Sequence, residues 1–198
     1  NRRFYNPHRA AMTMHRHLVL AAVVTLPGLG GLGLGLMYFF HPDEIARLTS
    51  VSGQELGFQL LLGTGFAAVS LAALLGVLKL ALLKPVVSFF AQLLNQYAIS
   101  VPVILILSLC AGVGEELLFR GAIQPWLGIW FTAFIFILLH GYLNPLNRPL
   151  MFYGTILLVV SAGFGYLCLH TGLYAAMTAH TVIDIALMMH LRKVAKQS

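Results

Sequence analysis

The chain has 198 residues, of which 59% are hydrophobic and only 9% are Asp, Glu, Lys or Arg, and its mean hydropathy is +0.87. A soluble domain of this size cannot bury so much apolar surface, which excludes a water-soluble globular protein. The formal net charge of +6 comes mostly from the two tails and one loop. This distribution predicts membrane orientation and does not support nucleic-acid binding.

Apolar runs of about twenty residues recur along the sequence, and each is long enough to cross the hydrocarbon layer as a helix. We therefore predict an all-α, polytopic transmembrane bundle of about six spans, which forms one membrane-embedded domain over residues 1–198. The spans are expected at residues 18–40, 56–78, 101–123, 126–142, 150–169 and 173–189. Residues 86–100 mix Ser, Gln and Asn with aromatic and aliphatic side chains, which predicts an amphipathic or half-embedded helix.

The basic residues predict how the bundle lies in the membrane. Six spans place both basic tails on one side, together with Lys79, Lys84 and Arg148. An excess of Lys and Arg marks the cytoplasmic side of a membrane protein. Asn1 and Ser198 are therefore both expected in the cytoplasm.

The first span is rich in glycine, with five glycines between positions 28 and 35. A phosphate-binding loop of similar composition would follow a strand and end in Lys, and neither feature is present in this part of the sequence. Small residues let helix backbones approach closely in lipid. We therefore expect these glycines to form a helix-packing surface.

A few ionisable residues interrupt the apolar segments. Between Pro85 and Leu191 the charged side chains are Glu115, Glu116, Arg120, Arg148 and Asp184, and all except Arg148 lie within predicted spans. An ionisable group at membrane depth costs roughly 2.5–3.5 kcal/mol on insertion scales, so such groups usually pair with one another or serve a function.

The spacing of these residues separates the two adjacent glutamates. Glu116 and Arg120 are four residues apart and share a helix face, whereas Glu115 points well away from Arg120. We therefore expect Glu116 and Arg120 to form a structural ion pair, which leaves Glu115 to face a cleft. In the last span, His180 and Asp184 also lie four residues apart on one face.

Helix geometry predicts that three of these side chains reach a similar depth. If the chain turns near Pro125, Glu115 lies about 15 Å back along its helix and His140 about 22 Å along the next helix. His180 lies about 13 Å from the turn at residues 171–172, on the same side of the membrane. Glu115, His140 and His180 are therefore expected to converge.

Three ordered motifs on successive apolar segments resemble those of a known family. They are Glu115-Glu116-x-x-x-Arg120, Phe136-x-x-x-His140 and His180-x-x-x-Asp184. The set looks like the CPBP family, which contains the CAAX proteases and the bacteriocin-processing enzymes also called Abi proteins, and whose best-known members are the type II CAAX prenyl endopeptidases. The resemblance covers about residues 101–189, which we expect to form the catalytic core.

The resemblance implies a glutamate-dependent intramembrane peptidase that works without a metal or other cofactor. Glu115 would be the general base and His140 its partner in activating a water, while His180 and Asp184 would stabilise the oxyanion. Several family members have Asn at the position of Asp184, and an ionised Asp cannot donate a hydrogen bond. We therefore expect Asp184 to orient His180 in its imidazolium form, so that His180 is the oxyanion donor.

The resemblance also implies a setting. The protein would be a multi-pass protein of the bacterial cytoplasmic membrane. Its partners would be the lipid bilayer and a membrane-associated protein or peptide substrate.

Four alternatives remain open at this stage. Glu115 can be a buried carboxyl group that is satisfied without a catalytic role. Glu115, His140 and His180 also make a His₂Glu set suited to zinc, although no H-E-x-x-H helix accompanies them. Some members of the family are linked to bacteriocin immunity, so the same pocket can instead bind a peptide without cleaving it. A small transporter with a Glu–His proton relay is the fourth reading, but no inverted repeat supports it.

Overall fold

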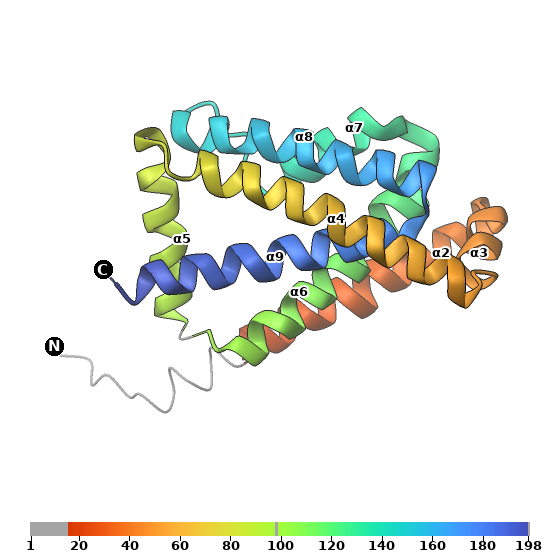
Figure 1. The fold of residues 1–198 in the computed structure, drawn as a ribbon. Coiled ribbons are helices and arrows are strands. Elements are labelled where there is room, and N and C mark those ends of the chain that lie inside the picture. The colour runs from red at the N-terminus through yellow and green to blue at the C-terminus, as the bar shows by residue number, and fades with distance from the viewer. Residues whose placement is uncertain (1–15, 98, 198) are drawn as a thin grey trace, which may run out of the picture.

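The computed structural model describes residues 16–97 and 99–197, and every regular element within them is a helix (Figure 1). The elements are η1 Val24–Gly30, α2 Gly31–Phe40, α3 Pro42–Thr49, α4 Gly53–Val77, η2 Ala81–Leu83, α5 Lys84–Gln96, α6 Val101–Glu116, η3 Leu117–Ile123, α7 Gln124–Leu139, α8 Arg148–His170 and α9 Leu173–Ala195. The all-α prediction is confirmed. Asn1 and Ser198, whose cytoplasmic location was predicted, lie outside the described residues.

Four helices in the described part of the chain are long and apolar enough to cross a membrane, which makes this a multi-pass membrane protein. They are Arg16–Phe40, Gly53–Val77, Val101–Leu139 and Arg148–His170. The third of these joins α6, η3 and α7, and so contains two of the predicted spans. Helix α9 is not among the four, since polar residues such as His180 and Asp184 interrupt its apolar sequence. The predicted count of six spans is therefore not fully confirmed.

The turn expected near Pro125 lies three residues later. Pro125 is in the first turn of α7, where its missing N–H does no harm, and the backbone leaves helical geometry at Gly128 with φ 72° and ψ 171°. Glycine adopts such a positive φ without the steric penalty of a side chain. Counted from Gly128, Glu115 lies about 20 Å back and His140 about 18 Å ahead at 1.5 Å per residue. The two side chains therefore reach nearly the same depth.

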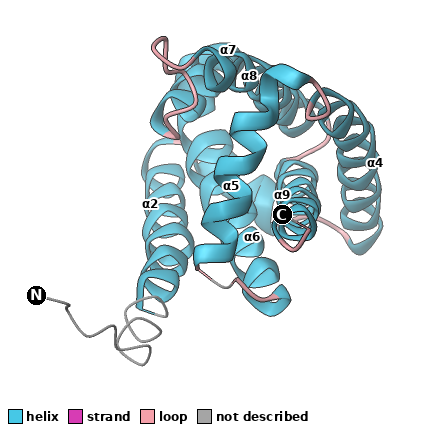
Figure 2. Ribbon diagram, turned by 90° about the vertical axis from the view of Figure 1, so that its left-hand side faces the viewer, coloured by secondary structure: helices cyan, strands magenta, loops and turns pink. Residues whose placement is uncertain are grey.

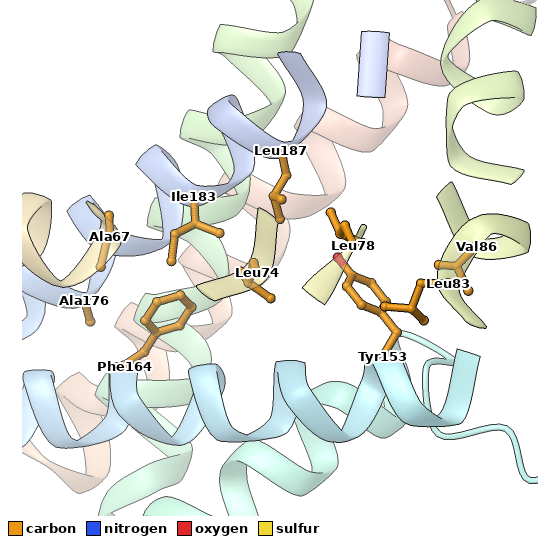
Figure 3. Packing of buried hydrophobic residues seen from close by; sticks show 11 residues of the cluster. Ala67, Leu74, Leu78, Leu83, Val86, Tyr153, Phe164, Ala176, Ile183 and Leu187 are labelled. Carbon is orange, nitrogen blue, oxygen red and sulfur yellow. The ribbon is translucent and has the colours of Figure 1, made fainter. Parts of the chain in front are cut away.

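Helix α9 lies at the centre of the bundle, packed against α4, α5, α6 and α8 (Figure 2). Its buried face joins side chains of α4 and α8 in the largest apolar cluster (Figure 3). The members shown there include Ala67 and Leu74 of α4, Phe164 of α8, and Ala176, Ile183 and Leu187 of α9. Because α9 contacts most of the bundle, its polar side chains are held in a defined place.

The helix expected at residues 86–100 is α5, which runs crosswise to α4 and α9 at one end of the bundle (Figure 1). Val86, Ala91 and Leu94 are buried on one face, whereas Phe89 and Leu93 are exposed. A helix with both faces of this kind suits the boundary between lipid and water.

The glycines of the first span pack against the segment that contains the adjacent glutamates. A side chain added at Gly33 would meet the backbone of Leu117 at 2.6 Å, and one at Gly30 would lie 3.3 Å from the Cα atom of Gly114. Close backbone approach of this kind requires small residues. The first span therefore packs directly against the backbone at the end of α6, next to the two glutamates.

Candidate active site

Three helices bring the predicted site residues together. Glu115 lies at the end of α6, His140 follows α7, and His180 lies on α9. The Oε2 atom of Glu115 is 3.7 Å from Nε2 of His140 and 3.9 Å from Nε2 of His180. One carboxylate thus faces two imidazole nitrogens that are far from it in sequence.

The orientation of His140 follows from a hydrogen bond to its own helix. Its Nδ1 lies 2.7 Å from the carbonyl oxygen of Phe136, and a carbonyl oxygen can only accept, so Nδ1 carries the proton. The Nε2 atom is left facing Glu115. The Phe136 ring lies 4.4 Å from the His140 ring, measured between centroids, and helps to hold the imidazole plane.

The His180 ring contacts two carboxylates at its opposite nitrogens, that of Asp184, as the sequence predicted, and that of Glu116, which the sequence predicted to pair with Arg120 alone. The Nδ1 atom of His180 donates to Oε1 of Glu116 at 2.8 Å, whereas Asp184 Oδ2 lies 3.6 Å away from the opposite nitrogen, Nε2. The reason is geometric, because Glu116 approaches from α6 and Asp184 from one turn further along α9. The Nε2 of His180 therefore faces both Asp184 and Glu115.

Glu116 and Arg120 form a buried ion pair within a network of polar and aromatic contacts. The Nε atom of Arg120 is 3.4 Å from Oε2 of Glu116, and the two side chains are 1% and 0% exposed. An Nη2 of Arg120 also donates to the carbonyl oxygen of Ser161 at 3.0 Å and to its hydroxyl at 2.8 Å. The guanidinium carbon lies 4.9 Å from the centre of the Phe136 ring, which adds a cation–π contact.

Ser161 was not among the residues predicted from the sequence. It is a small polar residue at the depth of an apolar span, which is a weak signal by itself, and it lies 41 residues from Arg120. Spacing along one helix reveals pairs such as Glu116 with Arg120, but a partner on another helix depends on how the two helices are rotated.

Glu115, His140, His180 and Asp184 all line one cavity of about 290 Å³. The side chains of Glu115 and His140 are 13% and 34% exposed, unlike the fully buried Glu116. A second cavity of about 530 Å³ extends between α5 and the C-terminal half of α9. Both cavities are bordered by Tyr142, Tyr153, Asp184, Leu187 and Met188. The site therefore adjoins a largely apolar space near one end of the bundle.

The described residues contain no group of three or more His, Cys, Asp or Glu side chains arranged to hold a metal ion. The Oε2 atom of Glu115 and Nε2 of His140 are 3.7 Å apart. Two polar atoms about 3.7 Å apart are too distant for a direct hydrogen bond but can both contact one water molecule.

Comparison with known proteins gives two findings. Residues 97–186 match the family described as Type II CAAX prenyl endopeptidase Rce1-like, which confirms the resemblance indicated by the three motifs. The chain is also 35% identical over 94 residues to the uncharacterized protein YpbD of Bacillus subtilis strain 168. That alignment covers 47% of this chain and 48% of YpbD, so the chain spans about half the length of its relative. No solved structure matches.

Proposed function

We propose that this protein is an intramembrane endopeptidase that hydrolyses a peptide bond in a membrane-associated protein or peptide. The observation that carries the proposal is the Glu115 carboxylate, which faces Nε2 of both His140 and His180 inside a cavity. The match of residues 97–186 to a family of endopeptidases supports the same reaction class. The Bacillus relative supports a bacterial cytoplasmic membrane as the setting.

In the proposed reaction, Glu115 and Nε2 of His140 hold one water between them. Glu115 takes a proton from this water as its oxygen attacks the carbonyl carbon of the substrate, which forms a tetrahedral oxyanion. A protonated His180 donates from Nε2 to that oxyanion. Glu115 then gives its proton to the departing amide nitrogen, the C–N bond breaks, and a carboxylic acid and an amine are released.

We further propose that residues 101–189 form the catalytic core of a single membrane-embedded domain. The first span packs behind α6 through Gly30 and Gly33, and α4 packs along α9. These N-terminal helices would therefore hold Glu115 and His180 in register without entering the chemistry.

The cavities suggest how a substrate reaches the site. The larger cavity extends toward Leu191 and His17, close to the basic residues Arg192 and Lys193 at the end of α9. By the positive-inside rule this end faces the cytoplasm. We propose that the substrate approaches from this side, between α5 and α9.

Quantitative mass spectrometry of membrane peptides tests the proposed function. Membranes that contain the wild-type protein should show new peptide termini that are missing when Glu115→Gln replaces it. Glu55→Gln is the matched control, because Glu55 is an exposed helix-capping residue outside the cavity, and a capping Gln preserves its role. Identical peptide patterns for wild type and Glu115→Gln would exclude the peptidase and favour a protein that only binds its peptide.

A further inference from the structure

We propose that Glu116 is a positioning residue that acts through His180. It holds the Nδ1–H of the imidazole, so that Nε2 faces Glu115 and the cavity. This gives Glu116 a task beyond neutralising Arg120. The catalytic consequence rests on the proposed function, whereas the positioning itself does not.

The geometry leaves the His180 ring little freedom. Its Nδ1 is 2.8 Å from Glu116 Oε1, and its ring lies nearly parallel to that of Phe164, with an interplanar angle of 18°. The Phe136 ring meets it edge to face at 84°. The two aromatic rings fix the plane of the imidazole but do not distinguish the two orientations related by a half-turn of the ring, which exchanges each nitrogen with a carbon. The hydrogen bond to Glu116 selects one of the two ring orientations.

Glu116 is itself held from two directions. Its carboxylate contacts His180 through Oε1 and Arg120 through Oε2, and Arg120 is anchored on α8 by Ser161. The chain of contacts therefore links α6, α8 and α9. Asp184 cannot take over the role of Glu116, because it lies near Nε2 of the same ring.

Two matched double variants separate positioning from charge balance. Glu116→Gln/Arg120→Gln removes both buried charges but keeps an amide oxygen that can accept from Nδ1–H. Glu116→Leu/Arg120→Leu removes the same charges and leaves no acceptor. Removing both members of a buried ion pair leaves no uncompensated charge. Neither double variant should therefore lose as much folding stability as a single substitution would. If charge balance were the only role of Glu116, the two variants would behave alike.

The direct measurement is nitrogen-15 NMR of histidine-labelled full-length protein, with the His180 signals assigned from their loss in His180→Gln. We expect Nδ1 of His180 to be protonated in the wild type and in the Gln pair. In the Leu pair Nδ1 has no acceptor, so the chemical shift of a hydrogen-bonded Nδ1–H should be lost even where Glu115 and Asp184 keep Nε2 protonated. An unprotonated Nδ1 in the wild type, or an unchanged hydrogen-bonded Nδ1–H shift in the Leu pair, would overturn the proposal. If the Leu pair does not fold, Glu116→Met/Arg120→Met replaces it, and the wild-type spectrum alone can still refute the inference.

Cleavage gives the second readout, using a synthetic peptide that spans a site found in the wild-type membranes. Per folded protein, the Gln pair should stay within about 10-fold of the wild type, and the Leu pair should lose about 10²-fold. Equal cleavage by the two pairs would overturn the positioning role. The expected NMR result combined with no cleavage by the wild type would instead reject the proposed function and leave the positioning intact.

Discussion

Glu115 and Glu116 are neighbours in the sequence but belong to two different polar regions. Glu115 faces a cavity, with its two imidazole partners at 3.7 and 3.9 Å. Glu116 is completely buried, accepts a 2.8 Å hydrogen bond from His180 and faces Arg120. The first region lines a cavity that can admit water and substrate. In the second, Glu116 and Arg120 contact each other, His180 and Ser161, although Glu116 Oε2 and Arg120 Nη1 have no hydrogen-bond partner among the described residues. We therefore expect reactivity in the open region around Glu115 and His140, and structural support in the closed region around Glu116 and Arg120.

The closed region should show the largest effect on stability. Glu116→Gln leaves Arg120 buried without its counter-charge, and breaking a buried pair in this way costs roughly 3–5 kcal/mol. We expect a strongly reduced yield of folded protein, measured by size-exclusion chromatography in detergent. Arg120→Gln added to this variant should restore part of the yield. A Glu116→Gln protein that folds as well as the wild type would show that the network contributes little.

The open region should respond in activity and not in yield. His140→Gln removes an imidazole that faces Glu115 in the cavity. We therefore expect cleavage of the synthetic peptide that spans a wild-type cleavage site to fall by about 10²-fold while the protein still accumulates. His170→Gln is the control, because His170 is exposed at the end of α8, outside the proposed site. If the His140→Gln protein instead fails to fold, His140 has a structural role like that of the residues in the closed region.

The sequence revealed those parts of the two regions that lie on one helix or at one depth. The spacing of Glu116 and Arg120 identified a shared face, and the helix rise placed Glu115, His140 and His180 at comparable depths. The hydrogen bond between Glu116 and His180 was not visible, because it depends on how α6 and α9 are rotated and spaced. The turn at Gly128 was also missed, since Pro125 is the stronger local signal although it suits the first turn of a helix.

The contact between α6 and α9 connects the two regions and can be disturbed in isolation. A methyl group at Gly112 would collide with the Thr181 side chain and would lie 2.9 Å from its backbone nitrogen. Gly112→Ala should therefore destabilise the protein by roughly 1–3 kcal/mol, as overpacking does elsewhere. Gly65→Ala on α4 meets only open space, and should be neutral or slightly stabilising. Thermal unfolding in detergent compares the two, and equal midpoints would argue against a tight α6–α9 contact.

Chelators should have the smallest effect of all. The proposed reaction uses only carboxylate and imidazole groups to activate water, so cleavage of the synthetic peptide in EDTA or phenanthroline should match the untreated rate. Loss of cleavage that one added metal restores would instead make Glu115, His140 and His180 the ligands of a catalytic ion.

The most direct test compares Glu115→Gln with Glu116→Gln/Arg120→Gln on the same peptide, with rates normalised to folded protein. Glu115→Gln keeps the shape of the side chain and removes the base, so cleavage should fall by a factor of about 10² or more at normal yield. The double variant keeps an acceptor for His180 and should remain within about 10-fold of the wild type. Retained cleavage in Glu115→Gln, together with a well-folded but inactive double variant, would contradict the division into an open reactive region and a closed supporting one.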